Sequence, residues 1–333
     1  MSRGYFDFVS QHQAYKELEK TWHVELATTT FFWFDLIVTP PAGVDYQKIA
    51  SDYLKALQEE VETTTDKRFV YFLASRTRVR FSTARQPHYS IFKSKLFVYV
   101  EIGRERSQRR LKIAIPRGTA PRVPPWTSDD GRFLLFQSGK NSKPEGISIH
   151  DFLMANGFDL GIDTEIQYVG STDDPAARPL KRKHRGYGDV AYSVPSDNND
   201  LFVFYNLFKV ISISTAKNSP IRFVVGNSII DEVKKREEGM IIEHRLVHYF
   251  GVKAQELDKK REYTKLKNGL TGLWKKCKIS KINFTIEVDQ KVDFFRFFSR
   301  NVTASDQHSF SCSVENGEVV IGEPIDVASF FKD

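Results

Sequence analysis

Residues 166–186 read IQYVGSTDDPAARPLKRKHRG, a pattern that predicts a strand, a tight turn and then a helix. Aromatic and β-branched residues open the stretch and are typical of a strand over 165–169. Asp174 is a suitable N-cap with Pro175 in the first helical position, so the helix is expected to run to about residue 183. The stretch therefore predicts a strand–helix unit that ends in a run of positive charge.

The segments on either side predict an α+β protein with a mostly antiparallel sheet. Residues 95–101, KLFVYVE, are aromatic and β-branched in the manner of a strand, whereas 44–62 and 229–250 have the character of helices. Prolines cluster with a glycine just before residue 125, where the composition is typical of a linker. We therefore expect a first domain to end there.

Positive charge is concentrated in the first part of the chain. The protein has 49 Lys and Arg against 42 Asp and Glu, and residues 68–122 hold 14 of the basic residues but only two acidic ones. On a strand, Arg76, Arg78 and Arg80 would project from one face. A face made of arginines is not expected to be buried in the core. Contact with a polyanion is the natural use of such a face, because Lys and Arg neutralise phosphates and release counterions.

The stretch around Tyr168 resembles the second half of the signature of the GIY-YIG nuclease superfamily. Tyr168-Val169-Gly170 takes the place of Tyr-Ile-Gly, and Arg178 follows the tyrosine by ten positions, a spacing typical of the family. Glu243 opens a segment, EHRLVHYF, that is similar to the glutamate helix of the family. The resemblance spans roughly residues 131–257.

The resemblance implies a metal-dependent endonuclease that hydrolyses phosphodiester bonds, with DNA a more suitable substrate than RNA. Glu243 would hold a single Mg²⁺ or Mn²⁺ ion, because hard cations prefer oxygen ligands. Arg178 would stabilise the charge that develops on the phosphoryl oxygens, and Arg182 lies one helical turn further on. Tyr168, helped by His184, would position or deprotonate the attacking water. A free-standing nuclease of this kind would suit restriction or anti-phage defence.

Together with the resemblance, the charge pattern divides the chain into three expected parts. A basic antiparallel-sheet domain that binds nucleic acid (1–125) would precede a GIY-YIG-like α/β core (126–280) and a small C-terminal β extension (281–333). Phosphate contacts, which position a protein without reading sequence, are expected from a set of basic residues. They are Arg76, Arg78, Arg80, Arg104, Arg106, Arg109, Arg110, Lys181, Lys183 and Arg185.

Two departures from the family pattern favour another interpretation, a nucleic-acid-binding protein of the same fold without activity. The nearest candidate for the first motif, Gly-Ile-Tyr, is Gly131-Arg132-Phe133, which lacks the tyrosine hydroxyl. The asparagine after the glutamate helix is also missing, and Gln255 is the nearest polar residue. A further interpretation is a protein-interaction or sensor module whose basic faces meet an acidic protein or a small anion.

Composition disfavours several other classes of protein. No apolar run approaches the roughly 20 residues of a membrane helix, and the first residues lack the apolar core of a secretory signal. Two cysteines, Cys277 and Cys312, cannot build a disulfide framework, and no GxxxxGK[ST] loop is present. We therefore expect a cytoplasmic protein without a membrane partner, and the sequence leaves its oligomeric state open.

Overall fold

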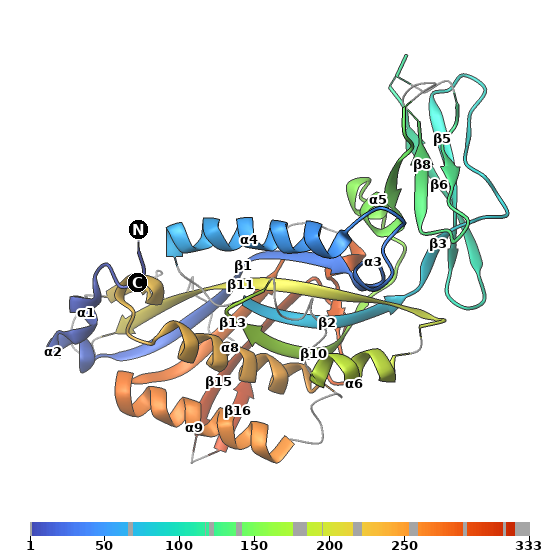
Figure 1. Ribbon diagram of the computed structural model, residues 1–333. Helices are drawn as coiled ribbons and strands as arrows, with labels where there is room; N and C mark the ends of the chain where they lie inside the picture. Colours follow the sequence, from blue (N-terminus) through green and yellow to red (C-terminus); the bar gives the residue numbers. More distant parts are fainter. Residues whose placement is uncertain are drawn as a thin grey trace.

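The computed structural model describes residues 2–65, 69–116, 118–119, 123–137, 142–175, 185–194, 196–215, 222–252, 259–288, 292–315 and 318–323. Helices and strands both contribute to this part of the chain, which confirms the expected α+β class. A large twisted sheet with helices on both faces forms the body of the molecule, and a smaller arm projects from one end of it (Figure 1).

Among the described residues, nine strands form the large sheet in the order β14-β10-β2-β11-β1-β13-β15-β16, with β12 paired to β11. Their bounds are β1 (Glu19–Trp33), β2 (Phe69–Thr77), β10 (Thr164–Thr172), β11 (Asn199–Thr215), β12 (Arg222–Gly226), β13 (Ile279–Glu287), β14 (Phe297–Phe298), β15 (Gln307–Glu315) and β16 (Glu318–Gly322). β2 pairs antiparallel with β10 and β11, whereas β1 pairs antiparallel with β11 and parallel with β13. Strands from all three segments expected from the sequence therefore share one sheet.

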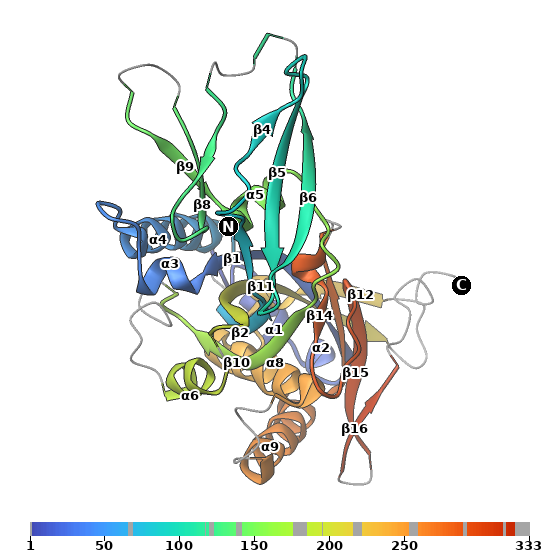
Figure 2. The same ribbon diagram turned by 90° about the vertical axis from the view of Figure 1, so that its right-hand side faces the viewer.

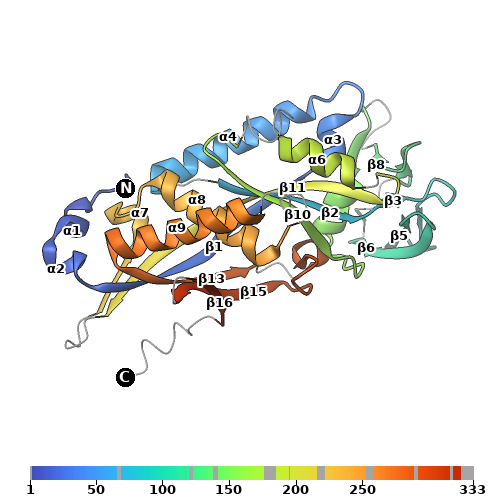
Figure 3. The same ribbon diagram turned by 90° about the horizontal axis from the view of Figure 1, so that it is seen from below.

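Alternate residues of the central strand β2 pack against different helices. Phe69, Tyr71 and Leu73 belong to an apolar cluster with α3, α4 and α6, and the residues between them belong to a cluster with α8 and α9. Figure 3 shows α8 and α9 side by side. The described helices are α1 (Asp7–Gln11), α2 (Gln13–Lys16), α3 (Phe34–Val38), α4 (Tyr46–Thr65), α5 (Ile149–Ala155), α6 (Arg185–Ser193), α7 (Asn227–Ile230), α8 (Lys235–Phe250), α9 (Lys259–Cys277) and the 3-10 turn η2 (Asp293–Phe295).

The helix expected over residues 229–250 is divided in two. Asp231 ends α7 with a left-handed backbone, φ 44°, and its carboxylate accepts a hydrogen bond from Arg3 Nε at 2.6 Å. α8 then begins at Lys235 and ends at Gly251, whose φ of 56° is the conformation that glycine adopts most readily. The end of the long helix was therefore predictable, whereas its interruption lies at Asp231, where the helix contacts the first residues of the chain.

The arm consists of two small sheets between β2 and β10 of the sequence. One contains β3 (Val79–Phe81), β4 (His88–Tyr89), β5 (Lys95–Ile102) and β6 (Ser107–Ala114), and the other contains β7 (Trp126–Thr127), β8 (Phe133–Phe136) and β9 (Glu145–Ser148). Val98, Val100 and Leu134 are buried in one cluster shared by the two sheets. Phe97 and Tyr99 alternate with them and are half-exposed, so one face of β5 remains accessible on an arm that stands away from the body (Figure 2).

Candidate functional site

Tyr168 lies in the middle of β10 and stacks on a second tyrosine from the neighbouring strand. The ring centroids of Tyr71 and Tyr168 are 6.0 Å apart, and the ring planes differ by 26°. Gly170 lies opposite Tyr71 in the antiparallel register, and a Cβ atom at Gly170 would come within 2.5 Å of Cζ of that ring. The Tyr-x-Gly spacing therefore has a packing reason, because the glycine leaves room for the tyrosine on the adjacent strand.

Sequence reasoning did not single out Tyr71. It ends the tripeptide Phe69-Val70-Tyr71, which lies opposite Gly170-Ser171-Thr172 in the antiparallel register although the whole arm separates β2 from β10 in sequence. The expected first motif, Gly131-Arg132-Phe133, instead lies in the arm, where Phe133 begins β8. A search for a tyrosine tripeptide at the start of an apolar strand, without a limit on its distance from Tyr168, would have found Tyr71.

The tyrosine pair is part of the core. Tyr71 is 1% exposed and Tyr168 is 9% exposed, and both pack in a cluster with Leu54 of α4 and Val190 of α6. In this conformation the two rings are enclosed between the sheet and its helices.

Glu243 lies on the other side of the sheet from Tyr168. Its Oε2 atom accepts a hydrogen bond from Oγ of Ser171 at 2.5 Å. Ser171 follows Tyr168 by three residues on the same strand, so the two side chains point to opposite faces. Val169, which shares the face of Ser171, packs in the cluster that contains α8. The resemblance had implied that Tyr168 and Glu243 share one cleft. The structure instead places them on opposite faces of the sheet.

Several expected residues fall in a part of the chain that the structure does not describe. They are Arg178, Lys181, Lys183, Arg182 and His184, and the side chain of Arg185 at the start of α6 belongs with them.

The described residues do not fit the single Mg²⁺ or Mn²⁺ ion that the resemblance implies. Within the described ranges, no three His, Cys, Asp or Glu side chains lie close enough together to hold a metal ion. Glu243 contributes a single carboxylate, and one of its oxygens already accepts the Ser171 hydroxyl. We assign no step to a metal.

Arg76, expected on an exposed basic face, is buried. It is 3% exposed, its Nη2 lies 2.9 Å from Oδ1 of Asp293, and its Nη1 donates to Thr164 Oγ1 at 2.9 Å. The guanidinium also lies 3.9 Å from the ring centroid of Phe294. Burial lowers the pKa of Arg76, and the adjacent Asp293 offsets part of that effect. The expectation that Arg76 binds phosphate is wrong, because its donors are used within the core.

Arg80 is likewise engaged, at the junction of arm and body. Its Nη1 donates to Oδ1 of Asp200 at 2.7 Å, and its guanidinium lies 4.8 Å from the ring centroid of Trp33. Asp200 is fully buried and also contacts Nε2 of His150 at 2.9 Å. Burial alone would raise the pKa of Asp200, but the contacts with His150 and Arg80 outweigh it and lower that pKa. Arg80 therefore stabilises the base of the arm through contacts with Asp200 and Trp33, and these contacts engage its guanidinium within the protein.

Other expected arginines lie near carboxylates or backbone carbonyls. Arg78, Arg104 and Arg106, together with Arg80, line a cleft of about 500 Å³ at the base of the arm. The acidic residues that line the same cleft are Glu101, Asp129, Asp130 and Asp197. Arg109 Nη1 donates to the carbonyl oxygen of Leu160 at 2.9 Å. The cleft has arginines and carboxylates in equal number, so it offers a bound anion little net attraction.

Arg110, in contrast, lies on a solvent-facing surface that combines cations with aromatic rings. In the register of β5 and β6, Tyr99 faces Arg110 and Phe97 faces Lys112. The Arg110 guanidinium lies 5.2 Å from the ring centroid of Phe97, and that of Arg85 lies 5.6 Å from the centroid of Tyr99. We call this surface the outer face of the arm, and it comprises Arg85, His88, Lys95, Phe97, Tyr99, Arg110 and Lys112.

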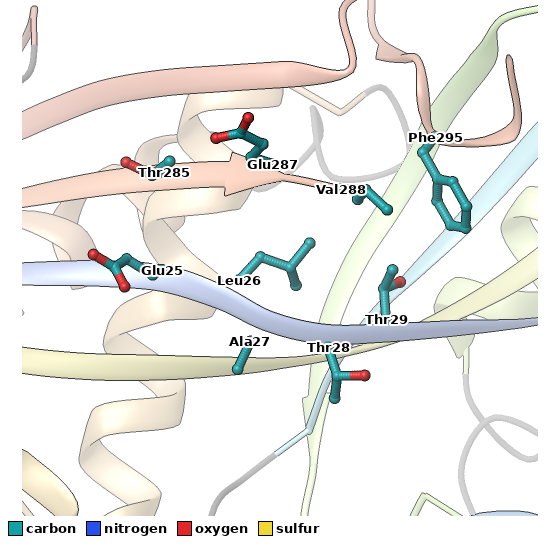
Figure 4. A pocket seen from close by; sticks show the side chains of 9 residues that line it. All are labelled: Glu25, Leu26, Ala27, Thr28, Thr29, Thr285, Glu287, Val288 and Phe295. Atoms are coloured by element: carbon teal, nitrogen blue, oxygen red, sulfur yellow. The ribbon is translucent and has the colours of Figure 1, made fainter. Parts of the chain in front are cut away.

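A separate pocket of about 490 Å³ lies where β1 and β13 diverge (Figure 4). Their parallel pairing reaches Glu25 and Thr285, and the pocket continues beyond this point with Leu26 and Val288 in the gap between the strands. Its charged lining residues are Glu25 and Glu287, so it would repel a phosphate group.

Comparisons with protein-family models, curated proteins and solved structures found no match for this chain. A search of the helices in the described ranges found none with the length and apolar character needed to span a bilayer.

Proposed function

We propose that the protein binds nucleic acid through the outer face of the arm. The observation that carries this proposal is the register of β4, β5 and β6, which sets Arg110 and Lys112 beside Tyr99 and Phe97 on one accessible surface. The acidic residue on this face of β5 is Glu101, at the base of the arm, where it accepts a hydrogen bond from Oγ of Ser82 at 2.7 Å. The rest of the face has positive charge without a carboxylate from its own strands.

The two kinds of side chain match the two components of a nucleic acid. Exposed Arg and Lys neutralise phosphates, and aromatic rings beside them offer flat surfaces on which bases or sugars pack. β5 has eight residues and therefore extends about 27 Å at ~3.4 Å per residue, which is about eight base pairs of duplex. Such contacts give affinity and position more than they give sequence specificity. DNA is the proposed ligand.

The test replaces exposed cations in two places. Arg110→Ala with Lys112→Ala should weaken binding to a short DNA duplex and lower the salt slope by about 1.8, since each lost phosphate contact is worth ~0.9. The matched control is Lys48→Ala with Lys55→Ala, two exposed cations on α4. An unchanged affinity in the arm variant, or an equal loss in the control, would reject the outer face as the binding surface.

Phosphodiester hydrolysis by a GIY-YIG-like site is the second candidate, and the stacked tyrosine pair favours it. Tyr71 ends a Phe-Val-Tyr tripeptide beside the Tyr-Val-Gly strand, so it supplies the hydroxyl that Phe133 lacks in the resemblance to the family. The burial of both rings and the position of Glu243 on the opposite face favour binding over cleavage. If the protein does cleave DNA, restriction or anti-phage defence remains the setting that we propose.

The cleavage candidate is tested with supercoiled and single-stranded DNA in the presence of Mg²⁺ or Mn²⁺. Tyr71→Phe and Tyr168→Phe should each abolish cleavage while leaving DNA binding unchanged, because each removes a hydroxyl and keeps the ring. Tyr192→Phe is the control, because this tyrosine lies exposed on α6. Full activity in both core variants would exclude the tyrosine pair, and no cleavage by the unaltered protein would leave binding alone.

A further inference from the structure

Two adjacent apolar side chains project from the turn between β4 and β5. Ile91 is 94% exposed and Phe92 is 89% exposed. Large apolar side chains in water carry a solvation cost that burial in a partner would remove. Their position at the end of an arm, away from the core, indicates that the partner is outside this molecule.

The turn holds these side chains outward through its own hydrogen bonds. Ser90 N donates to the carbonyl oxygen of Lys95 at 2.9 Å, and Lys93 N donates to that of Ser90 at 2.8 Å. The Ser90 hydroxyl accepts a third hydrogen bond, from Lys95 N at 3.1 Å. Lys93 has a left-handed backbone, φ 50°, which closes the turn behind Phe92. The exposure of Ile91 and Phe92 is therefore part of a defined conformation.

Charge next to the turn identifies the kind of partner. Residues 69–100 contain no Asp or Glu, and Lys93 and Lys95 flank the two apolar residues on the C-terminal side. Lys95 belongs to the outer face, so the apolar tip continues the surface that carries Arg110 and Lys112. An apolar pair at the end of a positively charged face is the arrangement with which proteins insert side chains between base pairs.

We propose that Ile91 and Phe92 insert between stacked bases of the nucleic acid bound along the outer face. The inference rests on the proposed function and adds the class of substrate: duplex DNA with a weakly stacked or mismatched step. Insertion requires two neighbouring bases to separate, and this costs least where stacking is already impaired. The arm therefore selects distorted sites rather than a base sequence.

The geometry of the face favours DNA over a lipid surface as the partner of the tip. The guanidinium of Arg85 lies beside Tyr99, four residues along β5 from Lys95, which is about 14 Å at ~3.4 Å per residue. A bilayer that took up the tip would leave Arg85 beyond the Debye length of ~8 Å in physiological salt. A duplex lying along the face contacts the tip and Arg85 together.

The experiment compares a matched duplex with the same duplex carrying one mismatch next to 2-aminopurine. The unaltered protein should bind the mismatched duplex about tenfold more tightly and increase the 2-aminopurine fluorescence, because the inserted side chains unstack that base. Ile91→Ser with Phe92→Ser should reduce the preference to less than about twofold and change the affinity for matched DNA by less than about threefold. Ile49→Ser with Tyr53→Ser, two half-exposed apolar residues on α4, should keep the preference.

The outcomes separate this inference from the proposed function. A preference that persists in the tip variant, or that is absent from a protein that still binds DNA through Arg110 and Lys112, overturns the insertion and leaves the binding surface intact. No binding to either duplex overturns both. A last measurement tests binding to vesicles of anionic phospholipid. If the unaltered protein binds them, the tip variant does not, and no mismatch preference for DNA is found, Ile91 and Phe92 belong to a membrane-binding surface and the inference is overturned.

Discussion

Arg76 and Asp293 form a buried ion pair, with Nη2 and Oδ1 2.9 Å apart and side chains that are 2% and 1% exposed. The other carboxylate oxygen of Asp293 accepts hydrogen bonds from the backbone N atoms of Leu160 and Ile162 at 2.8 and 3.1 Å. The pair thus connects β2 to η2 and to the segment that enters β10. An arginine expected to bind phosphate instead holds together three parts of the chain.

Removal of this arginine should destabilise the fold. Arg76→Ala leaves Asp293 buried without its charged partner, and we expect the free energy of unfolding in urea to fall by about 3–5 kcal/mol. Arg110→Ala, on the exposed outer face, should change it by less than about 0.5 kcal/mol. Equal effects of the two substitutions would contradict the assignment of Arg76 to the core.

Asp35, near the base of the arm, should make stability depend on pH. Burial raises the pKa of Asp35 to about 6, and the neighbouring Asp200 adds to this, whereas Arg80, Arg132 and Arg78 oppose it. The folded protein therefore binds a proton more tightly than the unfolded chain, so this group stabilises the fold at low pH and loses that contribution as pH rises from about 4 to about 6.

Asp35→Asn isolates this contribution. The variant should lack the fall in stability between pH 4 and 6, and its melting temperature relative to that of the unaltered protein should rise across this window. Asp197→Asn, an exposed carboxylate on the nearby cleft, is the control. Parallel stability curves for the Asp35 variant and the unaltered protein would show that Asp35 does not titrate in this range.

Gly170 should be intolerant of substitution because of Tyr71. A methyl group at Gly170 would overlap the Tyr71 ring, so we expect Gly170→Ala to cost about 1–3 kcal/mol. In a Tyr71→Leu background the same substitution should cost measurably less, which a double-mutant cycle in urea would detect. Gly188→Ala is the control, since a Cβ there has no neighbour within 4 Å. Additive costs would show that the two residues do not interact.

Arg245 should be replaceable by an apolar residue. It is fully buried and donates to the carbonyl oxygen of Leu266 at 3.3 Å, and its Nε and Nη2 have no hydrogen-bond partner among the residues that the structure describes. Burial lowers its pKa to about 10. Arg245→Met should therefore leave stability unchanged or raise it by about 1 kcal/mol. Arg3→Met should lower stability, because Arg3 pairs with Asp231 and Glu238. A large loss in the Arg245 variant would contradict this interpretation.

The sequence predicted local elements better than their partners. The helix over 44–62, the strand at residues 95–101 and the end of α8 at Gly251 follow from short-range patterns, and the structure contains all three. The joining of β1, β2, β10 and β13 into one sheet depends on contacts between distant segments, which periodicity does not encode. The domain limits expected at residues 125 and 280 followed from the linker-like composition near residue 125, the charge pattern and the resemblance.

The candidate sites show the same limit. Alternation on a strand placed Arg76, Arg78 and Arg80 on one face. It could not show that Arg76 would form an ion pair with Asp293, or Arg80 with Asp200. Tyr71 was missed because the arm separates it in sequence from Tyr168. Part of the outer face could have been predicted from the sequence, because alternation in KLFVYVE sets Lys95, Phe97 and Tyr99 on one side of a strand.

The parallel pairing of β1 with β13 also has a consequence for synthesis of the chain. A ribosome that adds roughly 5–20 residues per second completes β13 at least ~13 s after β1. Until residues 279–285 emerge, the edge of β1 that pairs with β13 has no partner in the nascent chain. The apolar residues Trp22 and Val24 lie on this strand. An open strand edge with apolar neighbours is a site of misassociation. Newly made chains should therefore depend on chaperones, and chains truncated before residue 279 should aggregate.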